Sequence, residues 1–349
     1  MAVDAAEVRQ RIDACCSSVS TPEQSKKSMD SIIADLAKGK LSLAQVIESS
    51  GEHLTSTNDL VRNLATSLLA TSIPHSPPSN PTALTTLLTF LSERLKDEPC
   101  VREVIRACEA LLVTSQGRVQ PLLLAHAECA DAAGRLLAAA LKDVHVQSLA
   151  LGDRARTYRV IEACAFEYGV PLPERFVEGF CNAMDGERDP RNLRLCFNII
   201  PRIAERGLIT SPEVAEAIFS VTSCYFPITF QPPPGDTVGI TNAMLKDALM
   251  ESMLCSHKLA SSATDLALGK LAASESMSAR LDALDLLSSL AARHGARVGL
   301  GGSARQVWSA LRLQMVDGQA DLGPDDVVQR ARSCLVHLLR AASDEEERE

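Results

Sequence analysis

The sequence predicts an all-α fold, an α-solenoid built from HEAT or armadillo-type helix pairs stacked as a right-handed superhelix. Three observations point to it: aromatic residues make up only 3% of the chain, apolar residues recur at helical spacing, and a short charged signature repeats along the chain. Strands favour aromatic and β-branched residues, so this composition excludes an all-β fold. With 349 residues, the chain also exceeds the length at which a single core usually stops growing.

The signature places an acidic residue five positions before an arginine, where an apolar stripe begins. Its copies are Asp97 to Arg102, Asp189 to Arg194, Glu275 to Arg280 and Asp325 to Arg330. After Asp97, one helical face carries Val101, Val104, Ile105, Cys108, Leu111 and Leu112. The copies recur at multiples of roughly 40 to 50 residues, the length of a HEAT or armadillo helix pair.

The repeat predicts about seven helix pairs, forming a single solenoid over residues 1–343 and followed by a charged tail over 344–349. The second helix of each pair is the one that the signature opens, either in a clear copy or in a weaker one at Asn58–Arg62, Asp153–Arg156 or Asn242–Lys246. We expect these second helices to begin near Leu60, Pro99, Arg154, Pro190, Thr241, Ser276 and Asp325.

Each part of the signature has an expected structural role. A carboxylate at a helix N-terminus satisfies free N–H groups, so Asp97, Asp189 and Glu275 are predicted caps, with Pro190 at the first helical position. One turn further on, an arginine can reach the acid of a neighbouring repeat. Arg102, Arg194 and Arg280 are therefore predicted to form an Asp/Arg ladder beside the apolar core.

Two segments interrupt the repeat. Residues 72–81 contain four prolines and read as a loop between helices. The second segment, 225–236, follows a helix that is predicted to begin near Pro212. Its prolines end that helix and predict an extended, proline-rich insertion over residues 227–239. We expect its aromatic rings to pack on the protein's own helices. The candidate docking residues for a partner are Gln231, Pro232, Pro233, Pro234, Gly235 and Asp236.

Charge and hydropathy limit the classes of partner. The net charge is −9 and the mean hydropathy is +0.04, and nucleic-acid binding needs clustered positive charge, so we expect no direct nucleic-acid ligand. The longest uncharged stretch, 63–92, is interrupted by prolines and cannot span a bilayer, so no membrane association is expected. The N-terminus has acids where a signal peptide carries lysines, which favours a cytoplasmic and nuclear protein.

The residues indicate no catalytic, cofactor or metal site. The eleven cysteines and seven histidines form no C-x-x-C pair and no paired zinc spacing, and Cys108, Cys164, Cys196 and Cys334 lie in apolar helical stripes. Glycines at 295–302 lack the Lys-Ser or Lys-Thr of a phosphate loop. The acids of 185–189 lack the glutamate of a calcium loop and are interpreted as turn and cap residues. An enzyme is therefore not expected.

Two longer motifs carry a family resemblance. The segments 184–193 (MDGERDPRNL) and 222–234 (TSCYFPITFQPPP), followed by Gly239-Ile240, resemble the N-terminal domain of the Mms-nineteen family. The match is strongest over 153–290. Two long motifs in the same order are far more specific than a generic HEAT pattern.

The resemblance implies a function. Members of that family are HEAT-repeat adaptors of the cytosolic iron-sulfur assembly targeting complex, associated with DNA repair and transcription. An adaptor of this kind passes iron-sulfur clusters, through partner subunits, to apo-proteins such as helicases and polymerases, and holds no cluster itself. A generic HEAT scaffold in transport or trafficking is the alternative, although the segment 225–234 is not expected in one.

Overall fold

The structure, a computed structural model, describes residues 4–17, 20–232, 239–273, 276–295, 303–316 and 324–346. Every regular element in these ranges is helical, as the composition predicted. The chain forms two compact units, Met1–Ala183 and Met184–Glu349. None of the described helices has the length and apolar character that crossing a membrane requires.

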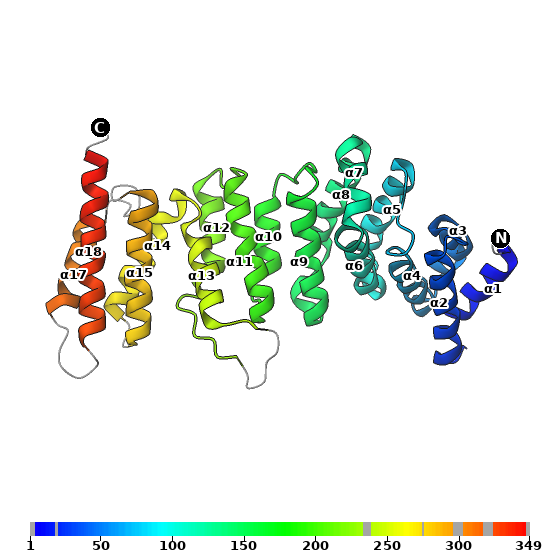
Figure 1. Cartoon of the computed structure of the whole chain (residues 1–349), viewed down its shortest axis with the longest axis horizontal. Helices are drawn as coiled ribbons and strands as arrows, with labels where there is room; N and C mark the ends of the chain where they lie inside the picture. Colours follow the sequence, from blue (N-terminus) through cyan, green and yellow to red (C-terminus); the bar gives the residue numbers. More distant parts are fainter. Residues whose placement is uncertain are drawn as a thin grey trace. The chain divides into compact units, whose positions relative to one another are not determined.

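Unit 1 is a series of packed helices (Figure 1). Its helices are α1 (Ala5–Cys16), α2 (Pro22–Ala37), α3 (Leu43–Leu54), α4 (Asp59–Ser72), α5 (Pro81–Arg94), α6 (Val101–Glu109), α7 (Gln116–Ala125), α8 (Ala127–Asp143), α9 (Leu151–Phe166) and α10 (Phe176–Met184), the last ending at the unit boundary. The second helices α4, α6 and α9 pack against one another in sequence, and the first helices α5 and α8 pack side by side. This two-layer stacking is that of an α-solenoid.

Unit 2 repeats the same arrangement. It contains α11 (Pro190–Glu205), α12 (Pro212–Ser223), α13 (Asn242–Leu254), α14 (Ala260–Ala273), α15 (Met277–His294), α17 (Ala304–Val316) and α18 (Pro324–Glu346). The second helices α11, α13, α15 and α18 form one layer, and α12, α14 and α17 form the other. Each of the seven predicted second helices is present, and the largest offset is at α9, which begins at Leu151 rather than at Arg154.

Local sequence explains where these helices start. Ser42 caps α3 and exchanges hydrogen bonds with Gln45, while Asn58 caps α4 through the N–H groups of Leu60 and Val61. Prolines occupy the first position of α5, α11 and α12, where the missing N–H costs nothing. The predicted stripes are buried; on α11, Leu193, Cys196, Phe197, Ile200 and Ile203 all lie in the core.

Two predicted element boundaries were wrong. The stripe after Asp97 suggested an α-helix through Leu112, but α6 ends at Glu109 and a π-helical turn, Ala110–Thr114, follows; the Tyr168 hydroxyl donates a hydrogen bond to the Leu112 carbonyl there. The charged tail predicted from 344 is helical as far as Glu346, because α18 meets no Gly or Pro before that point.

Candidate protein-interaction site

The proline-rich segment leaves α12 as a non-helical stretch, residues 224–232, which we call the strap. The helix ends at Ser223, and the backbone N–H groups of Tyr225 and Phe226 turn back to the carbonyls of Thr222 and Ser223. In Figure 1 the strap runs between α12 and α13 within unit 2. Because the strap has no helical hydrogen bonds, side-chain contacts must hold it in place.

Tyr225 anchors the start of the strap. Its hydroxyl donates a 2.7 Å hydrogen bond to the carbonyl of Glu187, and its ring lies edge-to-face against Phe197 of α11, with centroids 5.6 Å apart. Burial raises the pKa of the Tyr225 hydroxyl, so the phenol stays protonated and remains a donor at neutral pH. The two sequence motifs, 184–193 and 222–234, therefore meet in space through this residue.

The middle of the strap is anchored by apolar side chains. Phe226 and Ile228 are buried, and Phe230 is half-buried. The backbone N–H of Phe230 donates a 2.9 Å hydrogen bond to Oδ1 of Asn242, at the first turn of α13. The expectation that the rings pack on the protein's own helices is confirmed for Tyr225, whose ring contacts Phe197 of α11.

The turn that receives Tyr225 is itself rigidly built. Glu187 is fully buried, and its carboxylate accepts hydrogen bonds from the N–H groups of Arg188 and Asp189 and from Nδ2 of Asn192. Gly186 adopts a φ of 79°, a left-handed conformation that favours glycine. A buried carboxylate that accepts several hydrogen bonds fixes the turn, and with it the carbonyl that Tyr225 binds.

The far end of the strap faces solvent. Gln231 and Pro232 are exposed, while the other candidate docking residues, Pro233, Pro234, Gly235 and Asp236, lie outside the described residues. The arrangement within the described part is thus an anchored segment that ends in exposed polar and proline side chains. Such a segment offers ring faces and carbonyl oxygens to a partner without much loss of chain entropy.

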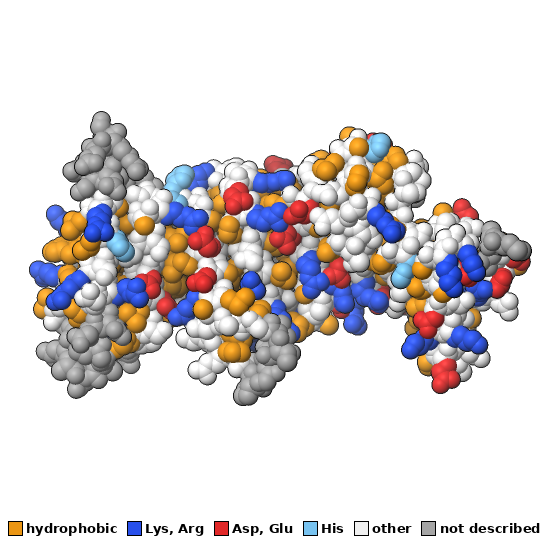
Figure 2. All heavy atoms as spheres, in the orientation of Figure 1, with side chains coloured by type: hydrophobic (Ala, Val, Ile, Leu, Met, Phe, Trp, Pro, Cys, Tyr) orange, Lys and Arg blue, Asp and Glu red, His pale blue; other side chains and the backbone are white. Residues whose placement is uncertain are grey.

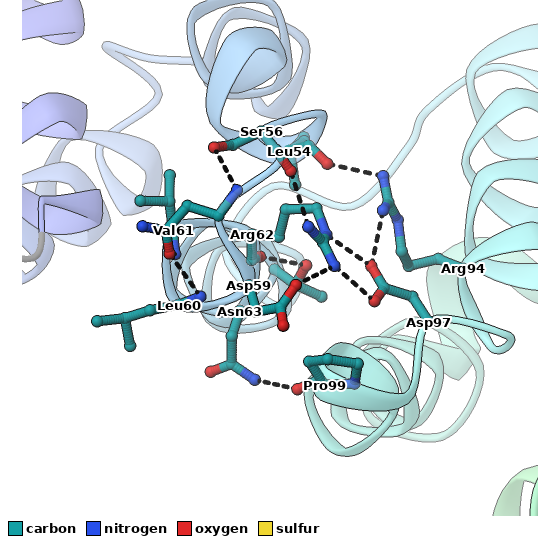
Figure 3. A network of polar contacts seen from close by, with 12 residues as sticks. Leu54, Ser56, Asp59, Leu60, Val61, Arg62, Asn63, Arg94, Asp97 and Pro99 are labelled. Atoms are coloured by element: carbon teal, nitrogen blue, oxygen red, sulfur yellow. Dashed lines mark hydrogen bonds and ion pairs between the residues drawn. The ribbon is translucent and has the colours of Figure 1, made fainter.

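In unit 1, Asp97 joins successive repeats (Figure 3). Its carboxylate accepts hydrogen bonds from Nε and Nη2 of Arg62, each at 2.9 Å, and from Nη1 of Arg94 at 2.8 Å. Arg62 also binds Asp59 and the Ser56 carbonyl, and Arg94 binds the Leu54 carbonyl. Asp97 makes no side-chain capping bond, so the structure corrects the predicted cap to a link between repeats.

Arg102 makes the equivalent link one repeat further on. Its Nε donates a 2.9 Å hydrogen bond to Oδ2 of Asp153, which is buried at the start of α9. The acid that receives it lies inside the helix rather than at its cap. Asp153 and the neighbouring partners Glu109, Arg156 and Arg159 were not singled out as ladder residues, because their spacing departs from the repeated signature.

The remaining predicted ladder residues have other positions. Asp189 caps α11 through the N–H groups of Arg191 and Asn192, with Pro190 at its first position. Burial raises the pKa of Asp189, but hydrogen bonds from Arg191 and the backbone hold it below its usual value. Arg194 makes no ion pair with any residue within the described ranges. Arg280 lies half-buried in the first turn of α15, and Glu275 lies outside the described residues.

The cysteines lie mainly in the core. Nine of the eleven are buried, including Cys108, Cys164, Cys196 and Cys334, whose core positions the sequence predicted; Cys224 is exposed and Cys255 is intermediate. Burial raises the pKa of the Cys164 thiol to about 12, so it stays protonated. Across the described ranges, no three His, Cys, Asp or Glu side chains are grouped so that they could hold a metal ion.

Comparison with known proteins adds to this geometry. Residues 47–317 match the family model MMS19_N, described as "Dos2-interacting transcription regulator of RNA-Pol-II". This range includes both the strap and most of the links between repeats.

Several curated proteins are similar over most of the chain. The "MMS19 nucleotide excision repair protein homolog" is 31% identical over 294 residues in Homo sapiens and over 297 residues in Xenopus laevis, covering 82% and 84% of this chain. The "DNA repair/transcription protein mms19" of Schizosaccharomyces pombe is 27% identical over 293 residues, 83% of this chain. The chain spans only 27% or 28% of the length of these relatives.

Proposed function

The chain belongs to the MMS19 family, and we propose on that basis that it is a protein-interaction adaptor associated with DNA repair and transcription. The names of the relatives support this association, and a stack of helix pairs supports the adaptor role, because such stacks present extended surfaces to partners. The proposed adaptor is non-enzymatic and acts in the cytoplasm and the nucleus.

We further propose that the partners belong to iron-sulfur protein assembly. In this proposal the chain helps to bring cluster-carrying subunits of the cytosolic targeting complex to apo-proteins that act in DNA replication, repair and transcription. The iron-sulfur cluster is cargo held by the partners and passed to the client. The resemblance of the motifs at 184–193 and 222–234 supports this assignment.

The observation that carries the proposal is the anchoring of the strap. Tyr225 and Phe230 fix it to α11 and α13, while Gln231 and Pro232 remain exposed beyond these contacts. A proline-rich segment that is already extended loses little entropy on binding, so it is suited to the groove of a partner. We therefore propose Gln231–Asp236 as the docking segment.

Binding between purified proteins tests the proposal. The 349-residue chain would be titrated with the purified propeller subunit of the targeting complex, with its small cysteine-bearing companion, and with an apo client helicase. Replacing Pro232, Pro233 and Pro234 with Ser should weaken binding to at least one of them by about tenfold, or roughly 1.4 kcal/mol. The control Pro77→Ser/Pro78→Ser changes prolines in a loop of unit 1 and should leave that binding unchanged.

Three outcomes are decisive. Undiminished binding of the triple variant, with an unchanged melting curve, would remove the strap from the docking site. A chain that binds none of the assembly subunits or the client would overturn the iron-sulfur assignment. Equal weakening in both proline variants would show that the effect does not come from the strap.

A further inference from the structure

A second feature of unit 1 lies where α6 and α9 pack against each other. Ion pairs cross this contact in an unbroken series, from Arg102 to Asp153, on to Arg156, then Glu109, and finally Arg159. Arg106, one turn after Arg102 on α6, pairs with Glu103. We call the four arginines 102, 106, 156 and 159 the arginine seam.

The geometry of the series is well defined. The Asp153 carboxylate accepts from Nε of Arg102 at 2.9 Å and from Nη1 of Arg156 at 2.6 Å. Nε of Arg156 lies 3.0 Å from Oε2 of Glu109, whose other oxygen accepts from Arg159. Each acid thus binds two arginines, which holds the guanidinium groups in fixed orientations.

The arginine side chains and the acidic side chains that bind them differ sharply in solvent exposure. The arginine side chains are 65% (Arg102), 38% (Arg106), 35% (Arg156) and 44% (Arg159) exposed. The acids that bind them are only 3% (Asp153) and 17% (Glu103 and Glu109) exposed. The negative charges of these ion pairs are therefore mostly covered while the positive ones face solvent. Figure 2 shows Lys and Arg side chains, with some Asp and Glu among them, over the part of unit 1 that contains α6 and α9.

The arginines also keep unused hydrogen-bond donors. Arg102 engages Asp153 through Nε alone, and within the described part of the chain its two terminal nitrogens bind nothing else. Arg159 uses only Nη1 in the same part of the chain. A guanidinium whose orientation is already fixed binds a carboxylate in a forked pair with little further entropy loss.

The link between the helices uses only part of each guanidinium group. Joining α6 to α9 requires the buried acids and the nitrogens that touch them, and an apolar contact of similar volume would join the helices equally well. The nucleic-acid backbone is a poor match, because its charge extends along its whole length and the chain as a whole carries a net charge of −9. A short run of carboxylates fits the size and sign of the seam.

We propose that the arginine seam docks an acidic segment of a partner protein, with Asp or Glu carboxylates paired to Arg102 and Arg159. The seam belongs to unit 1 and the strap to unit 2, so this proposal does not depend on the strap or on the iron-sulfur assignment. A partner that carries such a segment would be drawn to the seam by its charge, and the binding would weaken with added salt.

Peptide binding tests this docking surface. The probe is a fluorescein-labelled peptide of alternating Glu and Ser, compared with the same peptide carrying Gln for Glu and with a single-stranded oligonucleotide. The double variant Arg102→Gln/Arg159→Gln should weaken binding of the Glu peptide by about tenfold or more. The control Arg135→Gln/Arg175→Gln removes the same charge from two exposed positions, one on α8 and one in the turn before α10, and should change binding of the Glu peptide by less than about twofold.

The single variant Arg159→Gln keeps the bonds between Arg102, Asp153 and Arg156, so it tests docking even if the double variant is unstable. It should still weaken the Glu peptide severalfold, with Arg159→Lys falling between it and the native chain. Equal losses in seam and control variants would show a general charge effect and overturn the proposal. So would tighter binding of the oligonucleotide than of the Glu peptide, or binding of the Gln peptide as tight as that of the Glu peptide.

Discussion

The hydroxyl of Tyr225 donates a 2.7 Å hydrogen bond to the carbonyl of Glu187, which lies 38 residues earlier in the chain. This bond joins the turn before α11 to the start of the strap, and so joins the two motifs that carry the family resemblance. The Glu187 side chain holds the same turn from inside the protein. Both ends of the contact are therefore fixed before any partner binds.

Removing only the hydroxyl measures this bond. Tyr225→Phe keeps the ring against Phe197 and should lower stability by about 1 kcal/mol, or the Tm by about 2–4 °C. Tyr225→Leu also removes the edge-to-face ring pair and should lower the Tm further. Thermal unfolding followed by circular dichroism distinguishes them. If Tyr225→Phe melts at the native temperature, the hydrogen bond does not stabilise the strap.

Asp97 should be the most costly ladder residue to neutralise. Asp97→Asn weakens three charge-assisted bonds, two to Arg62 and one to Arg94, and leaves half-buried guanidinium groups without their anion. We expect a loss of about 1.5–3 kcal/mol in urea unfolding at pH 7. Asp30→Asn, at an exposed position of α2, is the control and should be neutral. Similar unfolding midpoints for the two variants would contradict a stabilising link.

The contribution of Asp97 should also depend on pH. Hydrogen bonds from Arg62, followed by those from Arg94, lower its pKa from 3.8 to about 2, against the opposing effect of burial. A folded-state pKa below the unfolded one stabilises the protein fully above the unfolded pKa, and the effect is lost as pH falls through the folded value. The stability gap between native chain and Asp97→Asn should be constant from pH 5 to 7 and shrink between about pH 4 and 2. If the difference in unfolding free energy between the native chain and Asp97→Asn stays unchanged at low pH, it does not come from the charge of Asp97.

Arg62 and Arg194 both lie near the start of a second helix, α4 and α11, but their replacement should differ in effect. Arg62 binds Asp97, Asp59 and the Ser56 carbonyl, whereas Arg194 has no ion pair among the described residues. Arg62→Ala should therefore lower the Tm clearly, while Arg194→Ala should stay within about 0.5 kcal/mol of the native chain. An equal decrease in both variants would indicate that the ladder extends through Arg194 as well.

The purified chain should carry no stoichiometric iron or zinc. Its cysteines are mostly buried thiols whose pKa is raised, to about 11 for Cys15 and about 12 for Cys16, mainly by burial, and a metal needs the thiolate. Elemental analysis of anaerobically purified protein should give metal well below one atom per chain. One firmly bound iron or zinc per chain would show that the protein holds metal itself and is more than an adaptor.

The sequence by itself determined the helices. A cap such as Asn58, a first-position proline such as Pro190 and a stripe such as that of α11 act within a few residues, so the local chain is enough to reveal them. The repeated acid-to-arginine spacing likewise placed the starts of the second helices. The sequence also identified residues 225–236, which follow the helix that begins at Pro212, as an interruption of the repeat.

Only the tertiary structure decided which side chains meet. Asp97 appeared to be a cap but binds Arg62, 35 residues earlier, and Arg102 reaches Asp153, 51 residues later. Such pairs depend on the distance and angle at which one helix pair stacks on the next. The spacing of residues within a single helix does not determine either of them. The same holds for Tyr225 and Glu187: the motifs were visible in the sequence, but their contact exists because α11 and the end of α12 bring them together.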